Sequence, residues 1–175
     1  MVEIRMAHLE DAVAIRSVMD SVLPLVREND FVADDLEFIS DHLVGPNGFG
    51  LVATSENQES IIAFLIARFP KNAPDNLGRD LGLTEHALEY VVHMESIAVM
   101  PVRQGEGIQR ALICEAEPIA FRLGAKLALC TVAPTNDASL ENFKRLGYQI
   151  MMCLDKYGGK KRFILGRSFC EEVIL

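Results

Sequence analysis

Two glycines, Gly105 and Gly107, stand where an apolar stretch (94–100, MESIAVM) gives way to a pattern typical of a helix. Glycine lets another group approach the main chain closely. The free N–H groups at the start of a helix also lie at the positive end of its dipole, where anions bind. The spacing therefore predicts a site for a phosphate, although a tight strand-to-helix turn without a ligand fits the same residues.

This turn differs from two familiar nucleotide-binding motifs. A P-loop needs Lys followed by Ser or Thr after its last glycine, and Ile108 and Gln109 stand there instead. The motif G-x-G-x-x-G needs a third glycine where Arg110 stands, and no early β-α-β unit surrounds it. If the turn holds a phosphate, it does so as part of another motif.

The elements that position this turn can be predicted from hydrophobic spacing and from turn residues. Strands are expected at 2–7, 48–55, 59–69, 89–100, 126–132, 148–154 and 162–168, and helices at 8–25, 33–44, 107–123 and 137–147. The segment 70–87 is expected to be a long loop, ENQ (56–58) a hairpin turn, and Tyr157-Gly158-Gly159 another. The order is that of an α+β domain with a mixed sheet.

Length and charge limit the class of protein. The 175 residues predict a single domain over 1–175, and the formal net charge of −8 argues against sequence-independent nucleic-acid binding. No apolar block approaches the length of a membrane span, and no signal peptide is apparent. The four cysteines lack the spacing of a zinc site or a disulfide framework, so no metal and a cytoplasmic location are expected. Cys114 and Cys130 are expected to be core residues.

Two segments together resemble the GNAT N-acetyltransferase superfamily. VMPVRQGEGIQRALICEAE (99–117) resembles the acyl-CoA-binding segment, whose pattern is Arg/Gln-x-x-Gly-x-Gly/Ala after a strand. NDASLENFKRLGY (136–148) is similar to the helix with the pattern Asn-x-x-Ser-x-x-x-Tyr. The resemblance implies a GNAT-like fold, a mostly antiparallel mixed sheet with helices on both faces, and acetyl-CoA as co-substrate.

The resemblance also implies roles for particular residues. The main chain of Ile97, Ala98 and Val99 would face the pantetheine arm and the acyl carbonyl, beside a strand that splays from its neighbour. The N–H groups of the turn would cradle the pyrophosphate; its residues are Gln104, Gly105, Glu106, Gly107, Ile108 and Gln109. Asn136 would bond to the pantetheine region, and the helix carrying Ser139, Asn142 and Phe143 would flank the cofactor.

Three residues depart from the family pattern. Gln109 replaces a small residue in the phosphate turn, and Glu106 places an acid near the phosphates. Phe143 stands where many members carry the tyrosine thought to protonate the departing thiolate. Water, Tyr148 or Tyr157 are the alternatives for that proton, and both tyrosines also fit structural roles.

Acyl transfer to an amine needs a base, because an amine with a pKa near 10 must first lose a proton. Glu95 is the first candidate, and orienting the substrate or forming a structural ion pair is its alternative role. His93 is the second candidate, since strand alternation puts it on one face with Glu95, Ile97 and Val99. The acids between 34 and 41 could attract a cation, but an exposed acidic helix face is the commoner meaning of such a run.

The sequence thus predicts an N-acetyltransferase that moves an acetyl group from acetyl-CoA to a primary amine of a small molecule or peptide. A homodimer is left open. The acceptor pocket implied by the resemblance lies among 20–45, 70–88 and 153–162. The alternatives are an acyl-CoA-binding or regulatory module without turnover, and an interaction domain with no cofactor.

Overall fold

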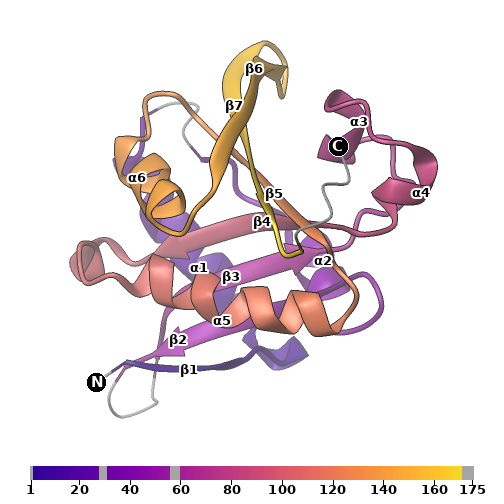
Figure 1. Cartoon of the computed structure of the whole chain (residues 1–175). Helices are drawn as coiled ribbons and strands as arrows, with labels where there is room; N and C mark the ends of the chain where they lie inside the picture. The colour runs from indigo at the N-terminus through magenta and orange to yellow at the C-terminus, as the bar shows by residue number, and fades with distance from the viewer. Residues whose placement is uncertain (1, 28–30, 56–59, 171–175) are drawn as a thin grey trace. The chain divides into compact units, whose positions relative to one another are not determined.

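The computed structural model describes residues 2–27, 31–55 and 60–170 (Figure 1). Its strands are β1 (Glu3–Met6), β2 (Gly48–Thr54), β3 (Ile61–Arg68), β4 (Val91–Val99), β5 (Leu127–Val132), β6 (Gln149–Lys156) and β7 (Lys160–Ser168). Its α-helices are α1 (Ala12–Val22), α2 (Leu36–Leu43), α3 (Leu77–Asp80), α4 (Glu85–Leu88), α5 (Ile108–Arg122) and α6 (Asp137–Arg145). The predicted ENQ turn lies outside the described residues.

The strands form a seven-stranded sheet in the order β1-β2-β3-β4-β5-β7-β6. The pairs β1–β2, β2–β3, β5–β7 and β6–β7 are antiparallel, and β4–β5 is parallel. Hairpins join β2 to β3 and β6 to β7, whereas β5 returns parallel to β4 through the crossover helix α5. The predicted α+β fold with a mixed, mostly antiparallel sheet is confirmed.

The chain divides into two compact units, which are described one at a time below. Unit 1 contains Met1–Arg68 and Glu95–Ala116, and unit 2 contains Phe69–Met94 and Glu117–Leu175. Both β4 and α5 pass from one unit into the other. The prediction of a single domain stays a prediction.

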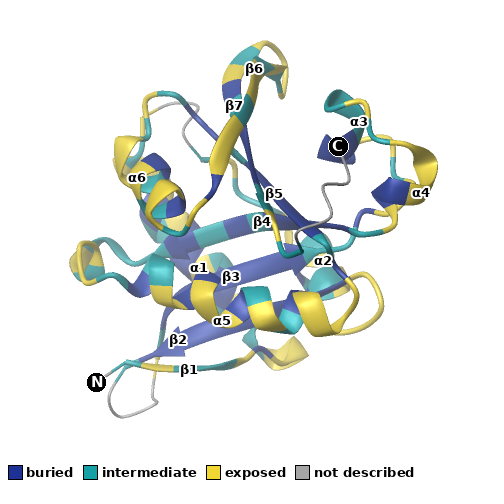
Figure 2. Cartoon of the chain, in the orientation of Figure 1, coloured by how far each residue is buried: buried dark blue, intermediate teal, exposed yellow. Residues whose placement is uncertain are grey.

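Unit 1 is built around β2 and β3, which are buried along almost their whole length (Figure 2). Its core joins residues of α1, α2 and these strands, including Ile15, Met19, Ile39 and Phe64. Full burial of such a side chain contributes about 1.5–3 kcal/mol. The helix α2 approaches β2 so closely that a Cβ on Gly50 would collide with Cδ2 of Leu43 and lie 2.9 Å from Cβ of Ala7. A larger residue at position 50 would therefore force these neighbours to shift.

Unit 2 has a separate apolar core that includes Leu77, Val91, Leu129 and Ile164. The hairpin of β6 and β7, the yellow end of the chain in Figure 1, turns through Tyr157, Gly158 and Gly159 as predicted. Tyr157 takes a positive φ of 51°, and the two glycines take 81° and 93°. Glycine adopts such angles at little cost, which fits two glycines in a tight hairpin.

Three expectations need correction. The segment expected to be a loop over 70–87 contains the short helices α3 and α4, which Asn76 and Thr84 cap through Gly78 N–H and Ala87 N–H. The predicted first helix is an α-helix only over Ala12–Val22, with single 3-10 turns on both sides. Cys114 is exposed rather than in the core. Side-chain caps such as those of α3 and α4 stabilise helices that are too short to show a clear hydrophobic period in the sequence.

The ladder between β4 and β5 is short, although both strands continue past it. Its residue pairs are Val91↔Leu127, Val92↔Ala128 and His93↔Leu129. On its other edge, β5 pairs antiparallel with β7 from Leu127 to Val132. Within unit 2, β5 thus has a partner strand on each edge. The splaying of β4 that the resemblance implies stays a prediction.

Candidate active site

The glycine turn lies where the sequence predicts it. A 3-10 turn (Pro101–Arg103) follows β4, and α5 begins at Ile108. Gly105 and Gly107 take φ values of 84° and 79°, angles that favour glycine. No heavy atom lies within 4 Å of the position that a Cβ on Gly105 would occupy, so the main chain is open to a neighbour there. The turn presents main-chain N–H groups at the start of a fifteen-residue helix.

Side-chain hydrogen bonds of Gln104 and Arg103 stabilise this turn. Nε2 of Gln104 donates to the main-chain oxygen of Val99 at 3.2 Å. Arg103 binds both carboxylate oxygens of Glu106, at 2.7 and 2.8 Å. This hydrogen bonding from Arg103 lowers the pKa of the Glu106 carboxyl. The acid that departs from the family pattern is thus paired with a cation three residues earlier, which offsets its repulsion of a phosphate.

On β4, burial alternates along the strand. Glu95, Ile97 and Val99 are partly exposed, whereas Ser96 and Ala98 between them are buried. This is the period of two that places alternate side chains on one face, and it puts Glu95 with Ile97 and Val99 as predicted. These residues and the 104–109 turn all belong to unit 1.

Glu95 faces a cation from the neighbouring strand. Its Oε2 lies 3.5 Å from Nη1 of Arg68 on β3. The side chains are only 12% (Arg68) and 22% (Glu95) exposed, so water screens the pair less than it would at the surface. Glu95 therefore has an ion-pair partner, the alternative role that the sequence left open, and it keeps partial access to solvent.

His93 differs from Glu95 in its surroundings. Its side chain is buried, and its Nε2 accepts a hydrogen bond from the Leu77 N–H at 3.1 Å. This bond uses Nε2 as a hydrogen-bond acceptor inside the core. It ties β4 to α3 within unit 2, so the geometry favours a packed histidine over a base.

Asp34 is a carboxylate that sequence reasoning grouped with the exposed acids before and on α2. Its Oδ2 is buried and has no hydrogen-bond partner in the described part of the chain. Burial raises the pKa of the Asp34 carboxyl to about 6, and the charge of Glu95 adds to the rise, while Ser96 and His42 oppose it. No sequence signal separates Asp34 from Asp35, because the difference arises mainly from burial in the folded chain.

The residues expected to flank the cofactor from α6 lie in unit 2. Asn136 is the N-cap of α6, and its Oδ1 accepts the Ser139 N–H at 3.1 Å. This leaves the Asn136 amide nitrogen for another acceptor. Ser139 and Asn142 are partly exposed, whereas Phe143 is buried and packs edge-to-face on Tyr148 with ring centroids 4.9 Å apart.

Three groups of unit 2, the hydroxyls of Tyr148 and Tyr157 and the thiol of Cys130, differ in how readily they could give up a proton. Burial and the neighbouring Glu117 carboxylate raise the pKa of Tyr148 far above its usual value. Burial likewise raises the pKa of the Cys130 thiol, which makes it a poor nucleophile. The Tyr157 hydroxyl is exposed and lies 3.1 Å from Oγ1 of Thr131 on β5. Of these groups, the Tyr157 hydroxyl is the one that solvent reaches.

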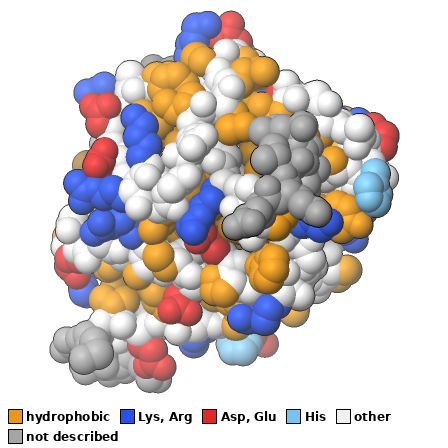
Figure 3. Space-filling model, viewed as in Figure 1, with side chains coloured by type: hydrophobic (Ala, Val, Ile, Leu, Met, Phe, Trp, Pro, Cys, Tyr) orange, Lys and Arg blue, Asp and Glu red, His pale blue; other side chains and the backbone are white. Residues whose placement is uncertain are grey.

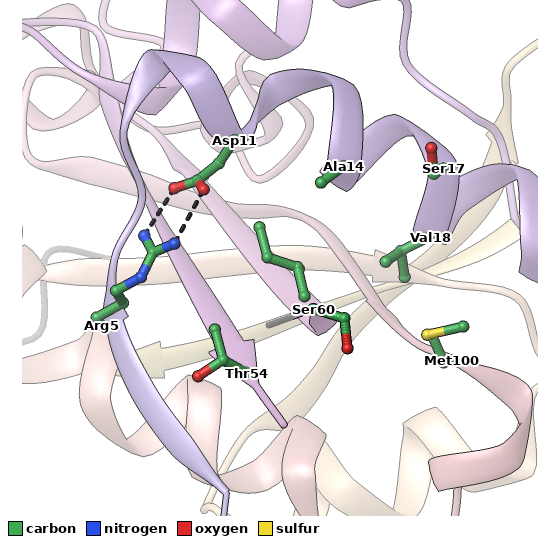
Figure 4. Close-up of a pocket in the computed structure, with 9 residues that line it drawn as sticks. Arg5, Asp11, Ala14, Ser17, Val18, Thr54, Ser60 and Met100 are labelled. Atoms are coloured by element: carbon green, nitrogen blue, oxygen red, sulfur yellow. Dashed lines mark hydrogen bonds and ion pairs between the residues drawn. The ribbon is translucent and has the colours of Figure 1, made fainter. Parts of the chain in front are cut away.

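A hollow of about 450 Å³ opens elsewhere in unit 1, and Figure 4 shows its lining. It lies among β1, α1, the ends of β2 and β3, and Met100. Both oxygens of Asp11 are bound by Arg5, at 2.7 and 2.9 Å, so the charged groups of this hollow neutralise each other. None of the predicted site residues lines it, and it offers no acid or base to the reaction.

Other kinds of site find little support. Among the described residues, no three His, Cys, Asp or Glu side chains are grouped so that they could hold a metal ion. The helices of the described chain include none with the length and apolar character to cross a bilayer. Acidic and basic side chains are mixed on the face that Figure 3 shows, rather than gathered into a basic surface.

Several solved structures share this fold. They include yncA from Salmonella typhimurium with acetyl-CoA (TM-score 0.75, 18% identity, 99% of this chain and 96% of that one). NAA60 from Arabidopsis thaliana in complex with acetyl-CoA has a TM-score of 0.74 at 15% identity, with 97% of this chain and 99% of that one covered. The ribosomal-protein-S18-alanine N-acetyltransferase from Escherichia coli has a TM-score of 0.70 at 16% identity, with 99% of each chain covered.

Comparison with curated protein sequences finds no match. A model of the acetyltransferase (GNAT) family does match, over residues 15–148. That range contains the 104–109 turn, the candidate base Glu95 and the capped helix α6. It also contains both sequence segments, 99–117 and 136–148, that resemble this family. The chain belongs to the acetyltransferase (GNAT) family.

Proposed function

We propose that this protein transfers an acetyl group from acetyl-CoA to a primary amine of a small molecule or peptide, by direct attack of the amine. The turn at 104–109 carries the proposal, because it joins two left-handed glycines to the start of α5. The two solved relatives that contain acetyl-CoA, and the one that is an N-acetyltransferase by name, support the cofactor and the reaction class.

In this proposal the main-chain N–H groups from Gln104 to Gln109 bind the pyrophosphate. The positive end of the α5 dipole adds to these hydrogen bonds. The main chain of Ile97, Ala98 and Val99 binds the pantetheine arm, and the Asn136 amide donates to it. Ser139, Asn142 and Phe143 supply a flank on α6. The bound acetyl-CoA supplies an acetyl group activated as a thioester.

Glu95 serves as the base. It takes a proton from the acceptor ammonium, either directly or through one water, and the neutral nitrogen then forms a bond to the acetyl carbon. Main-chain N–H groups near Val99 stabilise the negative charge that develops on the acetyl oxygen. As the C–S bond breaks, the thiolate leaves, and the nitrogen gives its second proton to water, which in turn protonates the thiolate. His93 is kept as the second candidate, although its Nε2 accepts the Leu77 N–H.

Protonation of the thiolate falls to water in this proposal. Phe143 has no hydroxyl group, and the raised pKa of the buried Tyr148 makes it a poor donor. Tyr157 is the remaining alternative, since its hydroxyl is exposed and lies 3.1 Å from Thr131 Oγ1. A thiol pKa near 8.5 means that a thiolate departs with modest help.

The acceptor pocket is proposed to involve 20–45, 70–88 and 153–162. Ion pairs within unit 2 stabilise parts of two of these segments. Arg79 binds both carboxylate oxygens of Glu85, at 2.6 and 3.1 Å, and Lys156 forms an ion pair with Asp80. We place the reaction in the cytoplasm, because the cysteine pattern fits a reducing compartment.

Two measurements test the proposal. Calorimetry with acetyl-CoA should show binding to one site, and a panel of primary amines should release free thiol with at least one acceptor. Binding without thiol release from any amine would favour the non-catalytic acyl-CoA-binding module. If calorimetry shows no heat and acetyl-CoA gives no thermal shift, the cofactor assignment itself is wrong.

A further inference from the structure

One face of the β6–β7 hairpin gathers positive charge. In the register of the hairpin, Leu154 lies opposite Arg162, and Lys156 lies opposite Lys160. Residues directly opposite each other, and residues two apart on one strand, point to the same face of a sheet. Lys156, Lys160 and Arg162 therefore share one face, although the chain as a whole has a formal net charge of −8. Such a local excess of cations attracts anions.

Arg162 is the buried member of this group, with only 4% of its surface exposed. Its Nη1 donates to the main-chain oxygen of Lys161 at 2.9 Å, and its Cζ lies 5.5 Å from the centroid of the Tyr157 ring. The ring and the carbonyl oxygen hold the guanidinium in place. Water screens a charge at such a site less than at the surface, so an anion that meets this guanidinium binds more strongly there.

Two hydroxyl groups lie on the same side of the hairpin. The Tyr157 hydroxyl lies 3.1 Å from Oγ1 of Thr131 on β5. Thr131 shares the face of Arg162, because it lies opposite Ile164, which is two residues further along β7. A guanidinium presents a planar fork of N–H groups that matches the two oxygens of a carboxylate, and hydroxyl groups are donors of the kind that a carboxylate accepts.

This face also meets α3. Leu154 packs against the core cluster that includes Leu77 of α3, and Asp80 of α3 forms an ion pair with Lys156. Asp80 thereby balances one of the three cations. Two of the segments proposed for the acceptor pocket, 70–88 and 153–162, thus come together at the hairpin face that carries Arg162.

We propose that this face binds a carboxylate group of the acceptor, so that the substrate is an amine that also carries a carboxylate, such as a free amino acid. Arg162 binds the carboxylate through its fork, and Lys160 adds positive charge beside it. This inference rests on the proposed function and names the substrate class of that reaction. No bond forms or breaks at this face, which holds the acceptor while its amine reacts.

Matched pairs of acceptors test the inference. Each α-amino acid is compared with its carboxamide, which keeps the amine and loses the negative charge. Wild-type kcat/KM should be about tenfold higher for the preferred acid than for its amide, as expected for one hydrogen-bonded charge pair. Arg162→Gln should remove this preference, mainly through a higher KM for the acid. Arg162→Lys keeps the charge but loses the fork, and should restore only part of it.

Two further variants separate recognition from general effects. Arg122→Gln removes an exposed arginine from α5 in the same unit and should leave the preference unchanged. Lys160→Gln removes a partly exposed charge, so it guards against a folding defect caused by replacing the buried Arg162. It should lower kcat/KM for the acid several-fold, and less at high salt. Melting temperatures are measured for every variant.

The outcomes distinguish this inference from the proposed function. If acids and amides are acetylated equally well, or if the preference survives Arg162→Gln in a folded protein, the inference is wrong and the reaction stands. A change in the KM for acetyl-CoA alone would assign the face to the cofactor and overturn the inference as well. If the acids raise the melting temperature of wild type with coenzyme A but not that of Arg162→Gln, and no amine releases thiol, the carboxylate site stands and the proposed reaction fails. If no acid binds or reacts, the inference is wrong.

Discussion

The imidazole Nε2 of His93 accepts the main-chain N–H of Leu77 at 3.1 Å, inside the core of unit 2. This bond separates the two candidate bases on β4. His93→Ala would leave a buried N–H without its partner, at a cost of about 1–3 kcal/mol. We expect a lower free energy of unfolding while kcat stays within a few-fold of wild type at permissive temperature. Unfolding curves and kcat measured on the same preparation test this, and a loss of kcat by orders of magnitude in a folded variant would restore His93 as the base.

Glu95→Gln should show the opposite behaviour. Removing a general base typically lowers the rate by about 10²–10⁴-fold. The loss should be largest near neutral pH and smaller at high pH, where the amine is already neutral. The measurement is kcat against pH for both proteins with one acceptor. Equal rates over the whole range would remove Glu95 from the mechanism.

The ion pair beside the glycine turn leads to a prediction about affinity. Glu106→Gln removes an acid next to the proposed phosphate site and breaks the ion pair in which Oε1 of Glu106 lies 2.7 Å from Nε of Arg103. Acetyl-CoA should therefore bind a few-fold more tightly, and the gain should shrink at high salt. Glu85→Gln is a matched control, because Glu85 is also an exposed glutamate held through both oxygens by one arginine. Weaker binding by Glu106→Gln would contradict the predicted phosphate position.

Gly105 and Gly158 form a second matched pair. Their φ values are 84° and 81°, and neither has a heavy atom within 4 Å of the position of a Cβ. Alanine at either site should cost about 1–2 kcal/mol through backbone strain alone. Only Gly105→Ala should also weaken acetyl-CoA binding in calorimetry, because it alone changes the proposed phosphate turn. An equal effect of both substitutions on affinity would mean that Gly105 acts through stability.

Asp34 predicts a pH dependence of stability. Its pKa is raised from the ordinary value of 3.8 to about 6, so the folded state holds its proton more tightly than the unfolded chain. The protein should lose stability as pH rises through the window between these values, by at most about 3 kcal/mol, and stay level above it. Asp34→Asn keeps the shape and removes the charge. It should be more stable than wild type at pH 7 and close to it at pH 4 in denaturant titrations.

Much of the fold could be predicted because it depends on local rules. The glycines at 105 and 107 predicted the strand-to-helix turn, since few other residues adopt their φ values. The Asn-Asp pair at 136–137 correctly placed the start of α6, because an N-cap acts on residues directly after it. Hydrophobic runs predicted the strands to within two residues at most ends.

The features that were missed depend on contacts between distant residues. Asp34 resembles the acids around it, and only burial beside Glu95 and Ser96 sets it apart. His93 follows the strand alternation that relates it to Glu95, but its partner lies on α3, in a segment predicted to be a loop. Sequence spacing gives the direction of a side chain along one element, whereas what that side chain meets is decided by the neighbouring elements.

The close approach of α2 to Gly50 has an evolutionary consequence. A methyl group at this position would collide with Leu43 on α2 and, at 2.9 Å, with Cβ of Ala7. Because Asp35 caps α2, a displacement of the helix would carry Asp34 with it. A change on β2 would then alter the burial of Asp34, and with it the pKa of its carboxyl group, while every acid and base stays in the sequence. Variation in acid tolerance among related proteins should therefore be sought under α2 as well as among the titrating residues themselves.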